Sequence, residues 1–260
     1  MDEPKHPIRR ILKIPSVFFN SGMRFSVRLV GAGGTGSHIL QGLVRIHFAL
    51  EGLGLNGLQV IVWDDDQVEP HNLVRQHFSP SHVRMNKAEA LIHEVNTKYG
   101  LDWFAFPEQC TGDIAIKCNF LITATDSGFF RNDVHKAIRS QKSNLHEEHA
   151  SMMKLLAWID CGNGKKSGQV IITDGRLPTP IDLNEGFFTF DRLPGSCSAQ
   201  ESLKTQDLFV NQATALYALD SLWKLLHDRY VDHHAVWFNL DTGKTTRSKI
   251  ASLGQKALGN

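Results

Sequence analysis

The residue types best suited to binding a polyphosphate are concentrated in one stretch of the sequence, residues 64–87. This stretch combines carboxylates, side-chain amides and cations, namely Asp64, Asp66, Asn72, Arg75, Gln76 and Lys87. An arginine can donate to two phosphate oxygens at once, and a lysine supplies a point charge. Such cations favour a reaction that cleaves the phosphates, because they offset the charge that develops there. Hydride transfer to a nicotinamide leaves the phosphates unchanged and does not need them.

A glycine-rich loop precedes this stretch and opens a predicted helix. Its members are Gly31, Gly33, Gly34, Thr35 and Gly36. Glycines permit a tight turn and let backbone N–H groups approach phosphates closely, and the N-terminus of the following helix favours negative charge. A Walker A loop is excluded, because no Gly-Lys-Ser/Thr sequence closes the motif. The loop therefore predicts a nucleotide site without specifying the nucleotide.

The elements that must position these groups begin with a βαβ unit. Residues 26–30 predict a buried strand, residues 37–50 an amphipathic helix, and the apolar sequence LNGLQVIVW a second strand that ends at Asp64. The crossover between the two parallel strands should be right-handed. At the end of the second strand, Asp64 can accept hydrogen bonds from ribose hydroxyls, as in NAD enzymes and adenylate-binding proteins alike.

The alternation of strands and helices continues downstream. Helices are expected at residues 86–99, 129–140 and 210–227, strands at 103–106, 118–126, 155–164 and 168–175, and a strand with a turn at 235–248. Residues 174–207 contain three prolines and three glycines and predict a long loop. The fold class is therefore α/β, with a mainly parallel sheet flanked by helices. We expect a single domain over residues 25–260, after an N-terminal arm of residues 1–24.

Composition narrows the class of protein further. The 260 residues include 28 Lys and Arg and 27 Asp and Glu, so no charge excess indicates a nucleic-acid or anionic-membrane partner. The longest run without a charged residue, Leu29 to Val44, is sixteen residues with five glycines, too short to span a bilayer. The four cysteines form no C-x-x-C pair, so we expect free thiols, neither a disulfide framework nor a structural zinc site, and a cytoplasmic protein.

The two motifs together resemble a known superfamily. The pattern D-x-D-x-V-x-x-x-N-L-x-R-Q of residues 64–76, after the G-x-G-G-x-G-S loop, is similar to the ThiF/MoeB/ubiquitin-activating-enzyme superfamily. The resemblance covers roughly residues 25–227. Within the superfamily, the chain is most similar to the ThiF-family protein of the plasmid-associated PRTRC gene system. It implies a Rossmann-like, ThiF-type adenylation domain. Such enzymes use ATP and Mg²⁺ to adenylate the C-terminal Gly-Gly carboxylate of a small ubiquitin-like or sulfur-carrier protein.

The resemblance also implies roles for individual residues. Gly33 and its neighbours would hold the adenine nucleotide, and Asp64 would bind the ribose. The phosphate ligands would be Asn72, Arg75 and Lys87, with Gln76 supporting them.

A second segment, Ala124-Thr125-Asp126-Ser127, matches the family's metal site. Asp126 corresponds to the family residue that coordinates Mg²⁺, although a helix N-cap is an alternative role for it. The family commonly has Asn where this chain has Ser127, and Arg131 matches a frequent family arginine.

The family further suggests residues outside these motifs. An N-terminal arginine is donated across a homodimer, and Arg9 and Arg10 are the candidates, although basic residues in such an arm can simply be solvated. Cys197, in the long loop, lies where relatives carry a nucleophilic cysteine, and a non-reactive cysteine is the alternative. Cys161 is expected to be a buried, small apolar residue. The polar segment 141–151 contains His146-Glu-Glu-His149, for which a solvated loop is favoured over a metal site.

Two other functions compete with adenylation. An NAD-dependent oxidoreductase would explain the glycine loop and Asp64, but would leave Asn72, Arg75 and Gln76 without a role. A catalytically inactive nucleotide-binding scaffold is the second alternative. The presence of every expected phosphate ligand argues against such a loss of activity.

Overall fold

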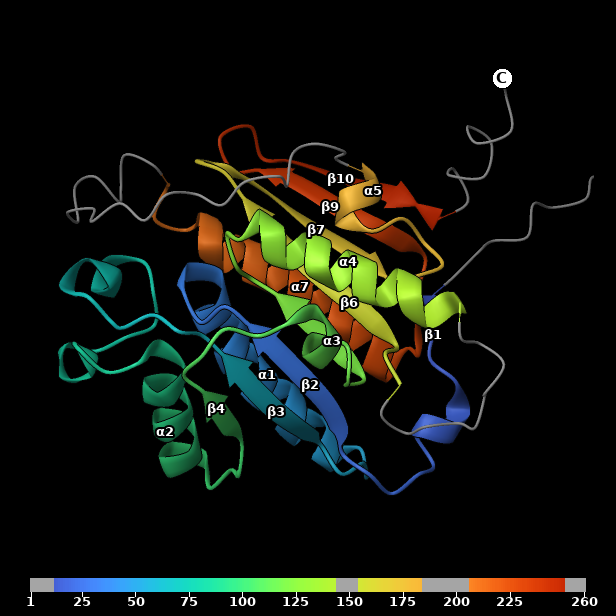
Figure 1. Cartoon of the computed structure of the whole chain (residues 1–260), viewed down its shortest axis with the longest axis horizontal. Coiled ribbons are helices and arrows are strands. Elements are labelled where there is room, and N and C mark those ends of the chain that lie inside the picture. Colours follow the sequence, from blue (N-terminus) through green and yellow to red (C-terminus); the bar gives the residue numbers. More distant parts are fainter. Residues whose placement is uncertain (1–11, 144–153, 184–205, 251–260) are drawn as a thin grey trace, which may run out of the picture.

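An eight-stranded mixed sheet forms the centre of the structure (Figure 1), a computed structural model that describes residues 12–143, 154–183 and 206–250. In spatial order the strands are β10 (Lys244–Lys249), β9 (His233–Asn239), β7 (Ser167–Thr173), β6 (Ala157–Asn163), β5 (Phe120–Thr123), β2 (Phe25–Val30), β3 (Leu58–Trp63) and β4 (Phe104–Phe106). The predicted α/β class is confirmed.

The sheet has a parallel part and an antiparallel extension. The strands from β4 to β6 pair in parallel, through four pairings. From β6 to β10 the three remaining pairings are antiparallel. Tight turns account for the pairings of β6 with β7 and of β9 with β10, whereas the segment that contains α7 connects β7 with β9. The predicted mainly parallel sheet is therefore confirmed for its first five strands. The C-terminal segment, expected as one strand and a turn, forms a two-stranded hairpin.

Helices cover both faces of the sheet. On one face lie α1 (Gly34–Gly52), α2 (Lys87–Tyr99) and α7 (Val210–His227), and on the other lie α3 (Gly112–Ala115) and α4 (Gly128–Ser143). Figure 1 shows α3 and α4 in front of the sheet and α1 and α7 behind it. A short helix, α5 (Pro180–Leu183), lies within the expected long loop 174–207, of which residues 184–205 are outside the described residues.

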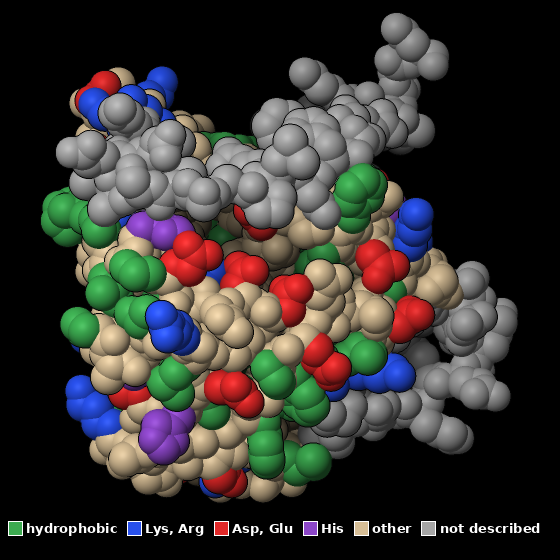
Figure 2. All heavy atoms as spheres, turned by 60° about the vertical axis from the view of Figure 1, so that its left-hand side comes forward, with side chains coloured by type: hydrophobic (Ala, Val, Ile, Leu, Met, Phe, Trp, Pro, Cys, Tyr) green, Lys and Arg blue, Asp and Glu red, His purple; other side chains and the backbone are tan. Residues whose placement is uncertain are grey.

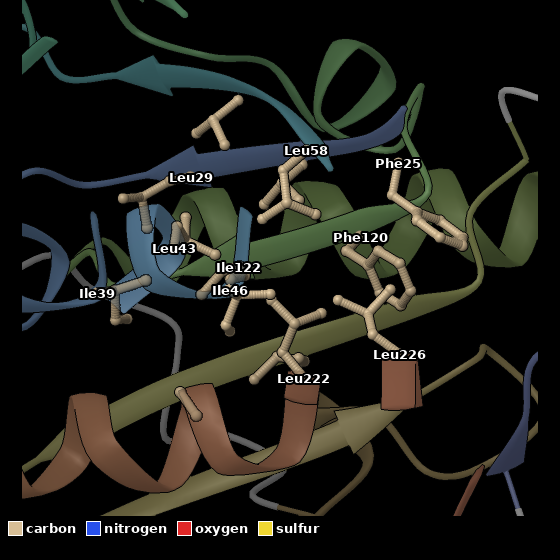
Figure 3. Close-up of a cluster of buried hydrophobic side chains, with 14 of the residues drawn as sticks. Phe25, Leu29, Ile39, Leu43, Ile46, Leu58, Phe120, Ile122, Leu222 and Leu226 are labelled. Atoms are coloured by element: carbon tan, nitrogen blue, oxygen red, sulfur yellow. The ribbon is translucent and has the colours of Figure 1, made fainter. Parts of the chain in front are cut away.

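Apolar side chains from strands and helices meet in one large cluster. Figure 3 shows Phe25, Leu29, Leu58, Phe120 and Ile122 of the central strands pointing toward residues of α1 and α7. The helical partners in this view are Ile39, Leu43, Ile46, Leu222 and Leu226. Strands β2, β3 and β5 are covered on both faces, which explains why apolar residues predominate in their sequences.

The segment before β2 is packed on the domain from Leu12 onward. β1 (Leu12–Lys13) pairs with β8 (Tyr230–Val231), and Leu12 and Ile14 are almost completely buried. Arg9 and Arg10 lie outside the described residues. None of the helices in residues 12–143, 154–183 and 206–250 combines the length and the apolar character needed to cross a bilayer.

Two glycines make the turn from β2 into α1 possible. Gly31 has φ of +95°, and a Cβ there would lie 2.5 Å from the carbonyl oxygen of Ala124. A Cβ on Gly36 would lie only 1.8 Å from the carbonyl oxygen of Gly31. Because both obstacles are backbone atoms, they cannot move aside as a side chain would. Only glycine therefore fits at these two positions. α1 begins at Gly34, three residues before the predicted start.

Substitution of Gly36 by alanine should destabilise the domain. The added methyl group must displace the Gly31 carbonyl, and overpacking of this kind costs about 1–3 kcal/mol. Gly33→Ala is the matched control, because a Cβ at Gly33 meets nothing within 4 Å. Urea unfolding followed by circular dichroism measures both. Equal stabilities for the two variants would contradict the packing of this turn.

Candidate nucleotide-binding site

The parallel strands leave a ligand site where their order reverses. From β2 the chain proceeds to β3 and β4 on one side, then returns to β5 and β6 on the other. In open α/β sheets, ligands bind at such a switch point, outside the carboxyl ends of the strands. The loops that follow β2 and β5 flank this point. They are in close contact, since Gly31 packs against the backbone of Ala124.

Asp64 ties the end of β3 to the glycine loop. One carboxylate oxygen accepts the backbone N–H of Ala32 at 2.6 Å, and the other accepts the N–H of Asp66 at 2.9 Å. Burial raises the pKa of Asp64 above its usual range, while the nearby Lys87 acts in the opposite direction. The predicted ribose ligand therefore lies at the mouth of the loop, where it also holds the backbone in place.

Lys87 is held beside Asp66 by an ion pair and by the backbone. Its Nζ lies 2.7 Å from an Asp66 carboxylate oxygen, and its backbone N–H donates to the Asp66 carbonyl at 2.9 Å. The Lys87 side chain is largely buried, whereas that of Asp66 is 68% exposed. A cation in the first turn of a helix opposes the helix dipole, and the adjacent carboxylate offsets that cost.

Asn86 positions Lys87 and was not singled out in the sequence. Its side-chain amide donates to the carbonyls of Asp64 at 2.8 Å and Asp66 at 3.1 Å. Its side-chain oxygen accepts the N–H of Glu89 at 3.1 Å and so caps α2. Asparagine followed three residues later by glutamate is a helix-start pattern, and this signal could have identified it.

The predicted phosphate ligands Asn72, Arg75 and Gln76 lie in and just after a 3-10 helix, Pro70–Val74. The Asn72 side-chain oxygen accepts the N–H of Glu69 at 2.9 Å, so Asn72 shapes the loop. Arg75 donates from Nη1 to Oε1 of Gln206. The side-chain oxygen of Gln76 is buried and has no hydrogen-bond partner among the described residues.

A set of polar side chains, most of them outside any sequence motif, joins Arg75 to the glycine loop. Gln206 donates to Oδ1 of Asn163 at 3.1 Å, and Asn163 in turn donates to the hydroxyl of Thr35 at 3.1 Å. Asn163 also donates to Oδ1 of Asn211, which accepts from the Thr35 hydroxyl at 3.3 Å as well. Of these four residues, sequence reasoning identified Thr35 alone.

Asp126 follows β5 at the switch point and is exposed. The residue that caps α4 is Ser127, whose hydroxyl accepts the N–H of Phe130 at 3.1 Å. The alternative role of Asp126 as the helix cap is therefore wrong. Its carboxylate forms no hydrogen bond or ion pair with another residue of the described part of the chain, so it is available to a ligand.

Arg131 lies beneath this loop in a buried ion pair. Its Nε is 2.7 Å from a carboxylate oxygen of Asp160, and one of its Nη atoms donates to the carbonyl of Cys161 at 2.9 Å. Thr123 donates to the same Asp160 oxygen. Burial raises the pKa of Asp160, and Arg131 opposes this shift. The pair holds α4 against the ends of β5 and β6, and thereby supports the loop that carries Asp126.

The carboxylates of Asp64, Asp65 and Asp66 provide a second set of oxygen ligands. One oxygen from each lies within 4.8 Å of the others, close enough to share a cation. Gln109 donates to Asp65 at 2.8 Å. Hard carboxylate oxygens match the preference of Mg²⁺, so the donors near the switch point fit this ion in kind.

The described thiols are unsuited to nucleophilic chemistry. Cys110, Cys118 and Cys161 are buried and free, as expected for Cys161. Burial raises the pKa of Cys110 and Cys118 to about 12 and raises that of Cys161 as well. A protonated thiol is a poor nucleophile. Cys197 and the segment 144–153, with His146 and His149, lie outside the described residues.

Figure 2 turns toward the viewer the side of the molecule that carries α2 and the chain between β3 and α2. Acidic side chains are spread over the middle of this face, with fewer Lys and Arg among them. Arg75 lies between β3 and α2, Lys87 begins α2, and both are at most partly exposed. Recognition of a polyphosphate would depend on individual cations and on the glycine loop, because the visible described surface of this face carries few basic side chains.

Comparisons with solved structures show the same fold. The crystal structure of PaaA superimposes with a TM-score of 0.60 at 16% identity, over 90% of this chain and 66% of that chain. E. coli MccB with ATP superimposes with a TM-score of 0.57 at 16% identity, with the same coverage. The microcin C7 biosynthetic enzyme MccB with N-formylated MccA gives 0.58 at 17% identity, over 90% and 67%. The chain thus spans about two thirds of the length of these proteins.

A comparison with curated proteins found no match to the sequence. The model of the ThiF family, in contrast, matches residues 18–174, which is more than half of the chain. This range includes the glycine loop, the 64–87 stretch and Asp126. The chain therefore belongs to the ThiF family.

Proposed function

We propose that the protein is an ATP-dependent adenylyltransferase. A carboxylate of the substrate attacks the α-phosphorus of ATP, pyrophosphate leaves, and an acyl-adenylate forms. The observation that carries this proposal is the arrangement of the glycine loop, Asp64, Arg75 and Lys87 around one switch point of the sheet. Membership in the ThiF family supports it, as do structural relatives that were crystallised with ATP and with the peptide MccA.

The proposed substrate is the C-terminus of a peptide or carrier protein. More narrowly, we propose a small ubiquitin-like or sulfur-carrier protein that ends in Gly-Gly, as the sequence resemblance implies. A homodimer in which Arg9 or Arg10 reaches the partner's nucleotide belongs to the same proposal. An adjacent gene for a small protein ending in Gly-Gly would identify the substrate directly.

Catalysis in this scheme depends on positioning and on charge. Backbone N–H groups of the glycine loop bind phosphate oxygens, Asp64 orients the ribose, and Arg75 and Lys87 offset the negative charge that develops as pyrophosphate departs. No general base is required, because the attacking carboxylate is already ionised at neutral pH. Asp126 would hold Mg²⁺, which when bound adds positive charge beside the phosphates.

The ion pair between Lys87 and Asp66 suits this role. A lysine without a partner would be costly at a largely buried helix start, so Asp66 neutralises it while no nucleotide is bound. Since the Asp66 carboxylate is mostly exposed, water solvates it when the pair separates, and the carboxylate loses little. An incoming phosphate can therefore take over the ammonium group.

The competing functions differ in what they bind. An NAD-dependent oxidoreductase would bind NAD tightly and ATP not at all, whereas an inactive scaffold would bind ATP and never form an adenylate. Calorimetric titration with ATP and with NAD separates the first alternative from adenylation, and the exchange assay below separates the second.

Replacing Lys87 by alanine should abolish most of the activity while leaving the fold intact. The loss of a preorganised charge at the phosphates is expected to lower the rate of ATP–pyrophosphate exchange about 100-fold. The assay uses labelled pyrophosphate, ATP, Mg²⁺ and the cognate carrier. Lys98→Ala, the same change in the last turn of α2 at an exposed position, should exchange at the wild-type rate. Full exchange by the Lys87 variant would exclude its assigned role.

Asp126→Asn should reduce exchange on the order of 100-fold, because a neutral amide is a weak ligand for Mg²⁺. Its free energy of unfolding should change by less than about 0.5 kcal/mol, since the exposed carboxylate has no partner among the described residues. Asp228→Asn, which changes an exposed carboxylate at the C-terminal end of α7, is the control for activity. A destabilised Asp126 variant, or one with normal exchange at limiting Mg²⁺, would contradict the metal role.

Cys197 is proposed as the acceptor of the activated acyl group. Its thiolate would attack the acyl-adenylate carbonyl, AMP would leave, and a thioester would form. The expected result is a covalent adduct with the carrier that appears on a non-reducing gel, disappears on treatment with thiol, and is absent from Cys197→Ala. Cys161→Ala serves as the control, because that buried thiol should make no contribution. An adduct that persists without Cys197 assigns the step to another group.

A further inference from the structure

A chain of side-chain amides runs from Arg75 to the start of α7. Arg75 donates to Gln206, Gln206 donates to Asn163 at 3.1 Å, and Asn163 donates to Oδ1 of Asn211. The Thr35 hydroxyl closes a triangle with Asn163 and Asn211, at 3.1 and 3.3 Å. Four segments that are distant in the sequence are thereby connected.

The direction of every hydrogen bond in this chain is set at one end. A guanidinium has donors only, so Gln206 must present its side-chain oxygen to Arg75. Its NH₂ group then faces Asn163, which must present oxygen to Gln206 and NH₂ to Asn211. The side-chain oxygen of Asn211 must therefore accept the hydrogen bond from Asn163. The group left over at the far end is a donor, the Nδ2 amide of Asn211.

This last donor is buried and has no hydrogen-bond partner among the described residues. Asn211 is 2% exposed, and a buried N–H without a partner is unfavourable and rare. The amide packs directly on the glycine loop, because a Cβ on Gly34 would lie 2.5 Å from Asn211 Nδ2. Flipping the amide would not help, since its oxygen already accepts from Asn163 and Thr35.

Two helix N-termini adjoin at the same place. Gly34 is the first residue of α1, and Asn211 is the second residue of the eighteen-residue helix α7. The N-terminus of a helix carries a partial positive charge and favours anions. The expected partner of the Nδ2 amide is therefore an acceptor with negative charge.

On the basis of the proposed function, we infer that Asn211 is a nucleotide-binding residue, whose Nδ2 amide donates to a phosphoryl oxygen of the ATP held on the glycine loop. The bond would satisfy the one donor that the amide chain leaves over. Because the chain ends on Arg75, the same bond would link two phosphate ligands and hold them in fixed orientations. Gln206 and Asn163 then act as positioning residues that fix which end of the Asn211 amide faces the ligand.

Asn211→Asp tests this inference with little change in shape. The carboxylate can still accept from Asn163 and Thr35, but it presents oxygen in place of the donor to the phosphate. Loss of a hydrogen bond to a charged group should weaken ATP binding about 10- to 100-fold in calorimetric titration. Gln212→Glu is the control, because it adds the same charge in the same turn of α7 at an exposed position. It should bind ATP like the wild type.

The outcomes distinguish this inference from the proposed function. Wild-type protein that does not bind ATP overturns both. Wild-type protein that binds ATP, together with an Asn211→Asp variant of equal affinity, overturns the inference alone. Equal weakening by Gln212→Glu also overturns it, because the effect would then come from charge near the helix start.

A second measurement avoids reliance on the stability of the variant. In ¹⁵N-labelled wild-type protein, the side-chain NH₂ signals of Asn211 should shift on addition of ATP, and exchange of these protons with solvent should slow. Assignment can use Asn211→Ser or selective labelling of asparagine. Signals that do not move at saturating ATP would overturn the inference.

Discussion

The close approach of the glycine loop to the end of β5 is the constraint on which the site depends. The Ala124 carbonyl lies where a side chain on Gly31 would begin, so two loops from neighbouring strands can meet without space between them. This contact brings the groups that follow β2 and those that follow β5 to one point of the sheet edge. The ion pair of Arg131 with Asp160 supports the same point from below, by holding α4 against the strand ends. The chemistry of the site is therefore fixed by backbone packing before any ligand is bound.

The ion pair of Lys87 with Asp66 joins a sheltered cation to an exposed carboxylate. Arg75 donates to the side-chain amide of Gln206, which orients it. A cation whose carboxylate partner is open to water can be transferred to phosphate at small cost. Such an arrangement explains how a chain with nearly equal numbers of acidic and basic residues can still hold a polyanion.

Local sequence patterns predicted the part of the site that lies in continuous segments. The glycine loop and the 64–87 stretch are short, and their residue types follow from what a phosphate requires, so local patterns are enough to propose them as candidate ligands. Asn163, Gln206 and Asn211 escaped notice because each is joined to its partners by contacts across 43 or more residues, and a single asparagine or glutamine carries no period or motif. The helix cap after β5 shows a different limit. Asp126 and Ser127 are both residue types that cap helices well. Because α4 begins at Gly128, Ser127 is the residue whose side chain accepts the N–H of Phe130 and caps the helix.

The antiparallel extension of the sheet has a consequence for association. Among the described strands, β10 lies at the edge of the sheet, and an edge strand can act as a template for pairing with another chain. Lys244 and Arg247 stand on this edge and are exposed. Charged side chains on an edge strand discourage such pairing, because a second copy would bring like charges together. The charged side chains of β10 therefore disfavour growth of the sheet by strand addition at this edge.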